Sequence, residues 1–72
     1  MTNEQKAIAC LQRMDMLNPD WNDPETSAID LSDLGCTLVT VWWEDSAGDY
    51  HTAVVRVNRG PAVLAMYAVN VA

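Results

Sequence analysis

Residues 37–44, Thr37-Leu38-Val39-Thr40-Val41-Trp42-Trp43-Glu44, form the stretch that decides the fold of this chain. Most of its side chains are β-branched or aromatic, and such side chains fit the pleated surface of a strand. The next residues, 45–49, hold a glycine between two aspartates, which is typical of a tight loop. A second strand-like run covers 50–57, and a third follows the turn residues 58–61. The pattern predicts a three-stranded antiparallel meander over residues 37–71.

The loop length predicts how the first two strands pair. With residues 45–49 as the loop, Glu44 lies opposite Tyr50 and Trp43 lies opposite His51. Successive side chains of a strand point to opposite faces of the sheet, so the residues divide into two sets. With a second loop at 58–61, Val57 lies opposite Ala62, Val55 opposite Leu64 and Ala53 opposite Met66. The set expected to form the core is Val39, Val41, Trp43, Ala53, Val55, Val57, Leu64 and Met66.

The other face of the predicted meander is unusually aromatic. A row of Trp42, Thr52 and Tyr67 is expected to cross it, with Tyr50 beside the first loop. A face that only meets water needs no such side chains. This row is therefore a candidate contact surface, for a partner or for a second copy of the chain.

The N-terminal residues predict one helix at about 3–17. Thr2 is a favourable N-cap, and Gln5 three residues later completes a capping box. Apolar residues then recur at spacings of three and four, as they do along one side of a helix. Asn18-Pro19 supplies a stop, because the residue before proline avoids the helical region.

Residues 18–35 form an acidic connection between the helix and the meander. Asp23 before Pro24 favours a short second helix that runs towards Leu34. The alternative is a short edge strand at 29–32, because apolar and polar residues alternate there. We expect Trp21 to fold back and close one end of the core.

The order of these elements predicts a single domain over residues 1–72. One N-terminal helix packed on one face of a three-stranded antiparallel meander is a two-layer α+β fold, with or without the short second helix. No apolar run reaches the roughly 18–20 residues of a membrane span, and no basic region precedes an apolar one at the N-terminus. We expect a cytoplasmic protein whose two cysteines, Cys10 and Cys36, are reduced core residues.

The charge balance narrows the class of partner. Four Lys and Arg residues stand against ten Asp and Glu residues, which gives a net charge of −6. No Lys or Arg occurs between Arg13 and Arg56. Direct binding to nucleic acid depends on basic side chains that neutralise phosphates, so this composition disfavours it. A basic protein surface is the expected partner, because an uncompensated negative field steers basic partners.

Catalytic and metal-binding patterns are weak in this sequence. His51 is the only histidine, and it could pair with Asp45 or Asp49, but the simpler expectation is a side chain at the margin of the core. No serine or cysteine has the context of an activated nucleophile, and no glycine-rich phosphate loop occurs. The loop at 45–49 is too short for a calcium site, and the cysteines lack zinc spacing. We predict no enzyme activity, no cofactor and no metal.

The candidate partner-binding residues are therefore carboxylates with two aromatic anchors. The carboxylates would take the place of phosphates as partners of Lys and Arg, and the aromatic side chains would supply buried contact area. The full set is Asp20, Asp23, Glu25, Asp30, Asp33, Trp42, Glu44, Asp45, Asp49 and Tyr50.

In its format this chain resembles the small acidic inhibitors of bacteriophages and mobile elements, such as anti-CRISPR and anti-restriction proteins. The resemblance consists of a short chain with acidic residues in one connection, 20–33, and at one hairpin tip, 44–49. It implies a non-enzymatic inhibitor in the host cytoplasm that blocks a basic DNA- or RNA-binding surface of a host defence complex. Some inhibitors of this type are similar to a nucleic acid in charge, and others block by contacts unrelated to mimicry.

The alternative function is structural. The chain could form a homodimer through the aromatic row of Trp42, Thr52 and Tyr67, or through the last strand. That strand, 62–71, carries no charge, and an uncharged edge strand invites pairing with another chain.

Overall fold

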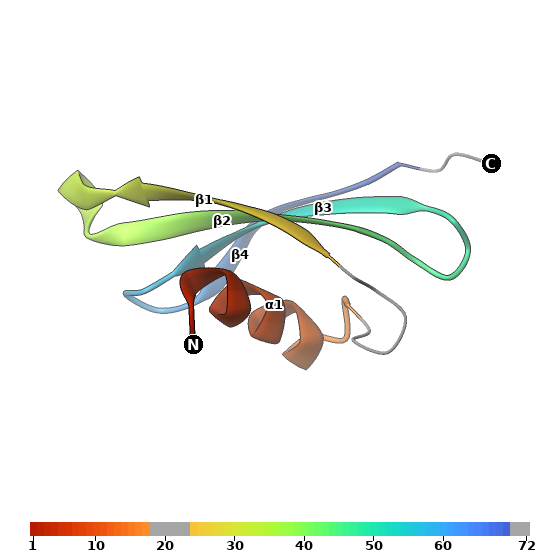
Figure 1. The fold of residues 1–72 in the computed structure, drawn as a ribbon, viewed down its shortest axis with the longest axis horizontal. Coiled ribbons are helices and arrows are strands. Elements are labelled where there is room, and N and C mark those ends of the chain that lie inside the picture. The colour runs from red at the N-terminus through yellow and green to blue at the C-terminus, as the bar shows by residue number, and fades with distance from the viewer. Residues whose placement is uncertain (18–23, 70–72) are drawn as a thin grey trace.

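The computed structural model describes residues 1–17 and 24–69 of the chain. It consists of one α-helix, one short 3₁₀ turn and four strands. The elements are α1 (Asn3–Arg13), β1 (Glu25–Leu31), the 3₁₀ turn Ser32–Leu34, β2 (Cys36–Glu44), β3 (Tyr50–Val57) and β4 (Ala62–Val69). The strands form one antiparallel sheet in chain order, and α1 lies along one side of it (Figure 1). The predicted α+β fold of a helix on a meander is confirmed, but the meander has four strands.

The acidic connection contains a strand where a short helix was favoured. β1 pairs with β2 along its whole length, from Glu25 opposite Trp42 to Leu31 opposite Cys36. This pairing gives hydrogen-bond partners to the backbone groups of β2 that face β1. The local helix signal at Asp23-Pro24 carries no information about this pairing between strands. The helical interpretation is therefore wrong, and the edge-strand alternative is right in kind but too short. The described residues contain no second α-helix.

The helix ends at Arg13, earlier than predicted. The capping box at its start is formed, with the Gln5 N–H donating to Thr2 Oγ1 and the Thr2 N–H donating to Gln5 Oε1. At its end the Asp15 N–H donates to the Gln12 carbonyl and the Met16 N–H to the Leu11 carbonyl. This is the Schellman arrangement, in which Asp15 takes the left-handed position at φ 57° that glycine usually occupies. The turn brings Leu17 into the core without a longer helix.

The hairpin between β2 and β3 matches its prediction. Glu44 lies opposite Tyr50, and Trp43 lies opposite His51. The loop is closed by the Asp45 N–H donating to the Asp49 carbonyl at 2.9 Å. Gly48 has a φ of 88°, a conformation that suits glycine because it has no Cβ.

The pairing of β3 with β4 differs from the prediction near the turn. Ala62 lies opposite Arg56 and Val63 lies opposite Val55, whereas farther along the strand Met66 lies opposite Ala53 as expected. The register shifts between these two regions because Leu64 is an extra residue in β4, an irregularity of the β-bulge type. Leu64 was predicted to join the core but is 52% exposed, and Val63 packs against the core in its place.

The sheet has one covered face and one open face. We call the face under α1 the covered face; it holds the core, and the other is the open face. The buried apolar residues are Ala7, Cys10, Leu11, Leu17, Val39, Val41, Trp43, Ala53, Val55 and Val57. Met66 was predicted to join them but is 42% exposed on the last strand.

Within the described residues, no helix is both long and apolar enough to cross a membrane.

The two cysteines have different surroundings. Both are free, and Cys10 is buried in the core as predicted. Cys36 is only half-buried and lies opposite Leu31, outside the core cluster. The prediction of two core cysteines is therefore right for Cys10 and wrong for Cys36, because the odd and even residues of β2 point to different faces.

Candidate binding site

The predicted acidic residues separate into two groups along the strands. β1 and β2 are antiparallel, so β1 begins beside the end of β2. One group, which we call the acidic end, consists of Glu25, Glu44, Asp45 and Asp49. The candidates Asp30 and Asp33 lie near the opposite end of the sheet, where β1 leads into β2. Asp20 and Asp23, like Trp21, fall outside the described residues.

Three of the four Lys and Arg residues lie at the end that Asp30 and Asp33 share. We call this the basic end; its cations are Lys6, Arg56 and Arg59, around the turn between β3 and β4. The fourth, Arg13, is the last residue of α1, on the helix side of the sheet. The long axis of the molecule measures 41 Å, so the two ends are well separated.

Polar side chains at the basic end bond to the protein itself. The Thr37 hydroxyl is buried and donates to Asp30 Oδ1 at 2.7 Å. Arg59 Nη1 donates to the Leu34 carbonyl at 2.7 Å, which ties the β3–β4 turn to the 3₁₀ turn. The Lys6 ammonium donates to Asn58 Oδ1 at 3.3 Å, which joins α1 to the same turn. These groups therefore hold elements of the fold together.

Asp45 has a structural role within the acidic end. Its Oδ1 accepts hydrogen bonds from the backbone N–H groups of Ala47 and Asp49, both at 2.9 Å. Its Oδ2 lies 2.7 Å from His51 Nε2. The hydrogen bond with His51, followed by that from the Asp49 N–H, lowers the pKa of Asp45 below its ordinary value of 3.8. Asp45 therefore orders the hairpin.

His51 is held from two sides. Its ring stacks on Trp43, with ring centroids 5.3 Å apart and an interplanar angle of 11°. The expected position at the core margin is confirmed, because His51 is half-buried beside the buried Trp43. Asp45, rather than Asp49, is its bonded partner. These contacts join the 45–49 loop to the start of β3, and β3 to β2 at Trp43.

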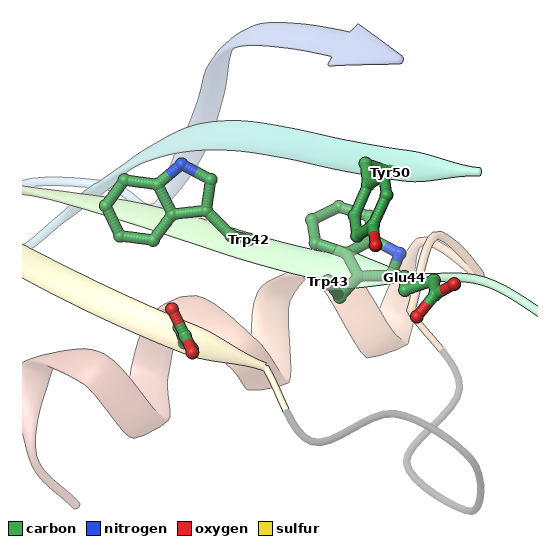
Figure 2. A pocket seen from close by; sticks show the side chains of 5 residues that line it. Trp42, Trp43, Glu44 and Tyr50 are labelled. Atoms are coloured by element: carbon green, nitrogen blue, oxygen red, sulfur yellow. The ribbon is translucent and has the colours of Figure 1, made fainter. Parts of the chain in front are cut away.

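A shallow hollow of about 400 Å³ lies at the acidic end, and Figure 2 shows its labelled side chains over the ends of β2 and β3. Its lining residues are Glu25, Trp42, Trp43, Glu44 and Tyr50. Trp42 is 41% exposed and Tyr50 is 52% exposed, although both are large aromatic side chains. Two predicted carboxylates and both predicted aromatic anchors thus meet in one concave surface.

Strand pairing explains this meeting. Glu25 lies opposite Trp42 across β1 and β2, and Glu44 lies opposite Tyr50 across β2 and β3. Trp42 and Glu44 are two residues apart on β2 and so share the open face. Sequence reasoning placed Glu25 in a helical connection, so it gave no reason to bring Glu25 beside Trp42. It also placed Trp43 only in the core, whereas this side chain also lines the hollow.

The carboxylates of the hollow have no basic partner within the chain. Among the described residues, the one salt-bridge contact found joins an aspartate, Asp45, to His51 and not to a Lys or Arg. All Lys and Arg residues are described, because residues 18–23 and 70–72 contain none. Glu25 and Glu44 therefore remain unneutralised by any Lys or Arg of this molecule.

The aromatic row crosses the open face as predicted. Trp42, Thr52 and Tyr67 lie opposite one another on β2, β3 and β4. Tyr67 is 64% exposed. Since β4 is an edge of the sheet, the row ends at a strand whose outer side pairs with no described strand.

Within residues 1–17 and 24–69, no group of three or more His, Cys, Asp and Glu side chains is placed to hold a metal ion. Comparison of the chain with protein-family models, curated proteins and solved structures finds no match.

Proposed function

We propose that this chain is a small non-enzymatic binding protein that inhibits a host nucleic-acid-binding defence complex, in the manner of anti-CRISPR proteins. It would act in the host cytoplasm by covering a basic DNA- or RNA-binding surface. One observation carries the proposal: the carboxylates of Glu25 and Glu44 have no basic partner in the chain and lie beside the exposed rings of Trp42 and Tyr50.

The charge separation suggests how the complex would form. A partner with a basic groove is attracted by the net charge of −6 and oriented by the position of the acidic end. Glu25, Glu44 and Asp49 would then replace phosphates as partners of its Lys and Arg side chains. The aromatic rings would add desolvated contact area, which long-range attraction alone does not supply.

Asp45 is better assigned to the fold than to the partner. Both of its oxygens already accept hydrogen bonds within the hairpin. We therefore restrict the proposed contact residues at this loop to Glu44 and Asp49. Asp30 and Asp33 are also left out of the proposed contacts, because the Asp30 carboxylate accepts from the buried Thr37 hydroxyl and Asp33 lies at the basic end.

Capture from a bacterial lysate tests this proposal with two variants of equal charge. Glu44→Gln with Asp49→Asn removes two charges at the acidic end, and Asp15→Asn with Asp33→Asn removes two elsewhere. Asn tolerates the left-handed backbone at position 15. We expect the first variant to bind a captured nucleic-acid-binding complex about tenfold more weakly, or about 1.4 kcal/mol, and the second to bind it nearly as wild type.

If both variants capture the complex as well as the wild type does, the acidic end is not the contact surface. If both variants lose affinity equally, net charge alone attracts the partner. Circular dichroism of each variant checks that the fold is retained, so that a lost complex reports on contacts.

The second candidate function is assembly through β4. This edge strand contains no charged residue, and its side chains Leu64, Met66 and Tyr67 are all exposed. Edge strands of this kind pair readily with other chains, and a two-fold dimer would join two sheets at β4. Light scattering over a concentration series tests this, with Leu64→Lys as the variant that would convert a dimer to a monomer. A wild-type monomer at all concentrations would contradict it.

A further inference from the structure

We propose that the hollow at the acidic end is a site for a single arginine side chain of the partner protein. The site consists of Glu25, Trp42, Glu44 and Tyr50. That the arginine comes from a partner protein rests on the proposed function. The ligand of this site is a guanidinium group, which the general attraction between opposite charges does not specify.

The positions of the two carboxylates favour one cation between them. Glu25 lies opposite Trp42, which is two residues from Glu44, so Glu25 and Glu44 are diagonal neighbours across β1 and β2. Diagonal neighbours lie about 7–8 Å apart in an antiparallel pair, within reach of long side chains. Glu44 Oε2 lies near Gly48 of the hairpin loop, so a cation between the two residues would contact both carboxylates once the Glu44 side chain turns towards β1. Without one, two like charges share this part of the open face.

The aromatic rings select the shape of that cation. Trp42 is directly beside Glu25 and Tyr50 is directly beside Glu44, so each carboxylate borders an exposed ring. A guanidinium group is planar, stacks on aromatic faces and donates two parallel hydrogen bonds to a carboxylate. A lysine ammonium is a compact, strongly hydrated charge that gains less from a flat ring. The combination therefore favours arginine over lysine.

Charge excludes one main class of competing ligand. The volume of about 400 Å³ is enough for one side chain and lies near the lower limit for small-molecule sites. A nucleotide or phosphate would meet two unneutralised carboxylates and be repelled. The chain's own basic residues are also excluded, since neither Glu25 nor Glu44 forms an ion pair with one.

The test uses synthetic peptides as probes. A short peptide with three arginines and a matched peptide with three lysines are titrated into the ¹⁵N-labelled protein, and the indole N–H signal of Trp42 is followed by NMR. We expect saturable shifts of this signal with the arginine peptide and about fivefold weaker binding of the lysine peptide, because only the guanidinium stacks.

Variants locate the binding. Glu25→Gln with Glu44→Gln should weaken the arginine peptide by about tenfold, and the equally charged Asp15→Asn with Asp33→Asn should weaken it by no more than about twofold. Equal affinity for both peptides, equal weakening in both variants, or no shift at the Trp42 indole would each overturn the arginine site.

The outcome is separable from that of the proposed function. If a lysate partner is captured through Glu44 and Asp49 but the arginine peptide shows no preference, the arginine site is wrong and the proposed function stands. If the arginine peptide binds at the hollow but no nucleic-acid-binding complex is captured, the proposed function is wrong and the chemistry of the hollow stands.

Discussion

The two ends of the sheet use charged residues in different ways. At the basic end, Asp30, Arg59 and Lys6 each bond to a group on another element of the same chain. At the acidic end, Asp45 is bonded internally, but Glu25 and Glu44 have no basic partner. Charges at the first end therefore serve the fold. Glu25 and Glu44 form no such bond, which is why we propose that they contact a partner.

The largest expected loss of stability comes from a substitution at the basic end. Asp30→Ala removes the acceptor of the Thr37 hydroxyl, which is only 4% exposed. A buried donor left without an acceptor costs about 1–3 kcal/mol, so the free energy of unfolding should fall by this amount in urea denaturation. Asp33→Ala, an exposed carboxylate at the same end, is the control and should change stability by less than about 0.5 kcal/mol. Equal effects would mean that the Thr37 bond is unimportant.

A smaller effect is expected from Arg59→Met. This variant removes the donor to the Leu34 carbonyl, a bond that joins two turns. The loss should be about 0.5–1.5 kcal/mol, measured by thermal denaturation, since exposed groups can turn to water. Arg59→Lys keeps the charge but not the planar donor group. Wild-type stability in Arg59→Met would contradict a structural role for this end.

The Asp45–His51 contact predicts a pH dependence at the acidic end. The lowered pKa of Asp45 means that its contribution is fully present above the ordinary value of 3.8 and is lost as the pH falls through the lower, folded-state pKa. Asp45→Asn should therefore be less stable than wild type at pH 7, and the difference should shrink on acidification below about pH 4. Urea denaturation at several pH values measures it. A difference that is constant with pH would contradict the role of the carboxylate.

The smallest effect concerns the two unneutralised carboxylates. Glu25→Gln with Glu44→Gln should leave the free energy of unfolding unchanged or raise it by up to about 0.5 kcal/mol, because the variant removes like charges from neighbouring strands. Chemical denaturation in low salt is the measurement. A loss of more than about 1 kcal/mol would show that these residues stabilise the fold, and would remove the contrast between the ends.

Local patterns in the sequence were enough to predict α1 and the β2–β3 hairpin. Thr2 and Gln5 specify the helix start through neighbouring residues, and the loop at 45–49 sets the register of the strands it joins. The contacts that form α1 and this hairpin join residues close together in the sequence, so residue spacing is enough to predict them. The same holds for the aromatic row that starts at Trp42.

Elements that depend on tertiary pairing were predicted less well. β1 exists because β2 offers a long free side, and the signal at Asp23-Pro24 favoured a helix instead. The irregularity at Leu64 follows from how the β3–β4 turn aligns its strands, which sequence alternation alone does not specify. The hollow depended on β1, so the proximity of Glu25 to Trp42 could not be predicted although both residues were candidates.

Charge-based blocking by the acidic end is tested most directly by capture of the partner with the wild-type protein, followed by elution in a salt gradient and by competition with double-stranded DNA. We expect a nucleic-acid-binding complex that is released by moderate salt and displaced by DNA, because the same basic surface binds both the protein and the DNA. A captured partner that resists both salt and DNA would contradict charge-based blocking by the acidic end.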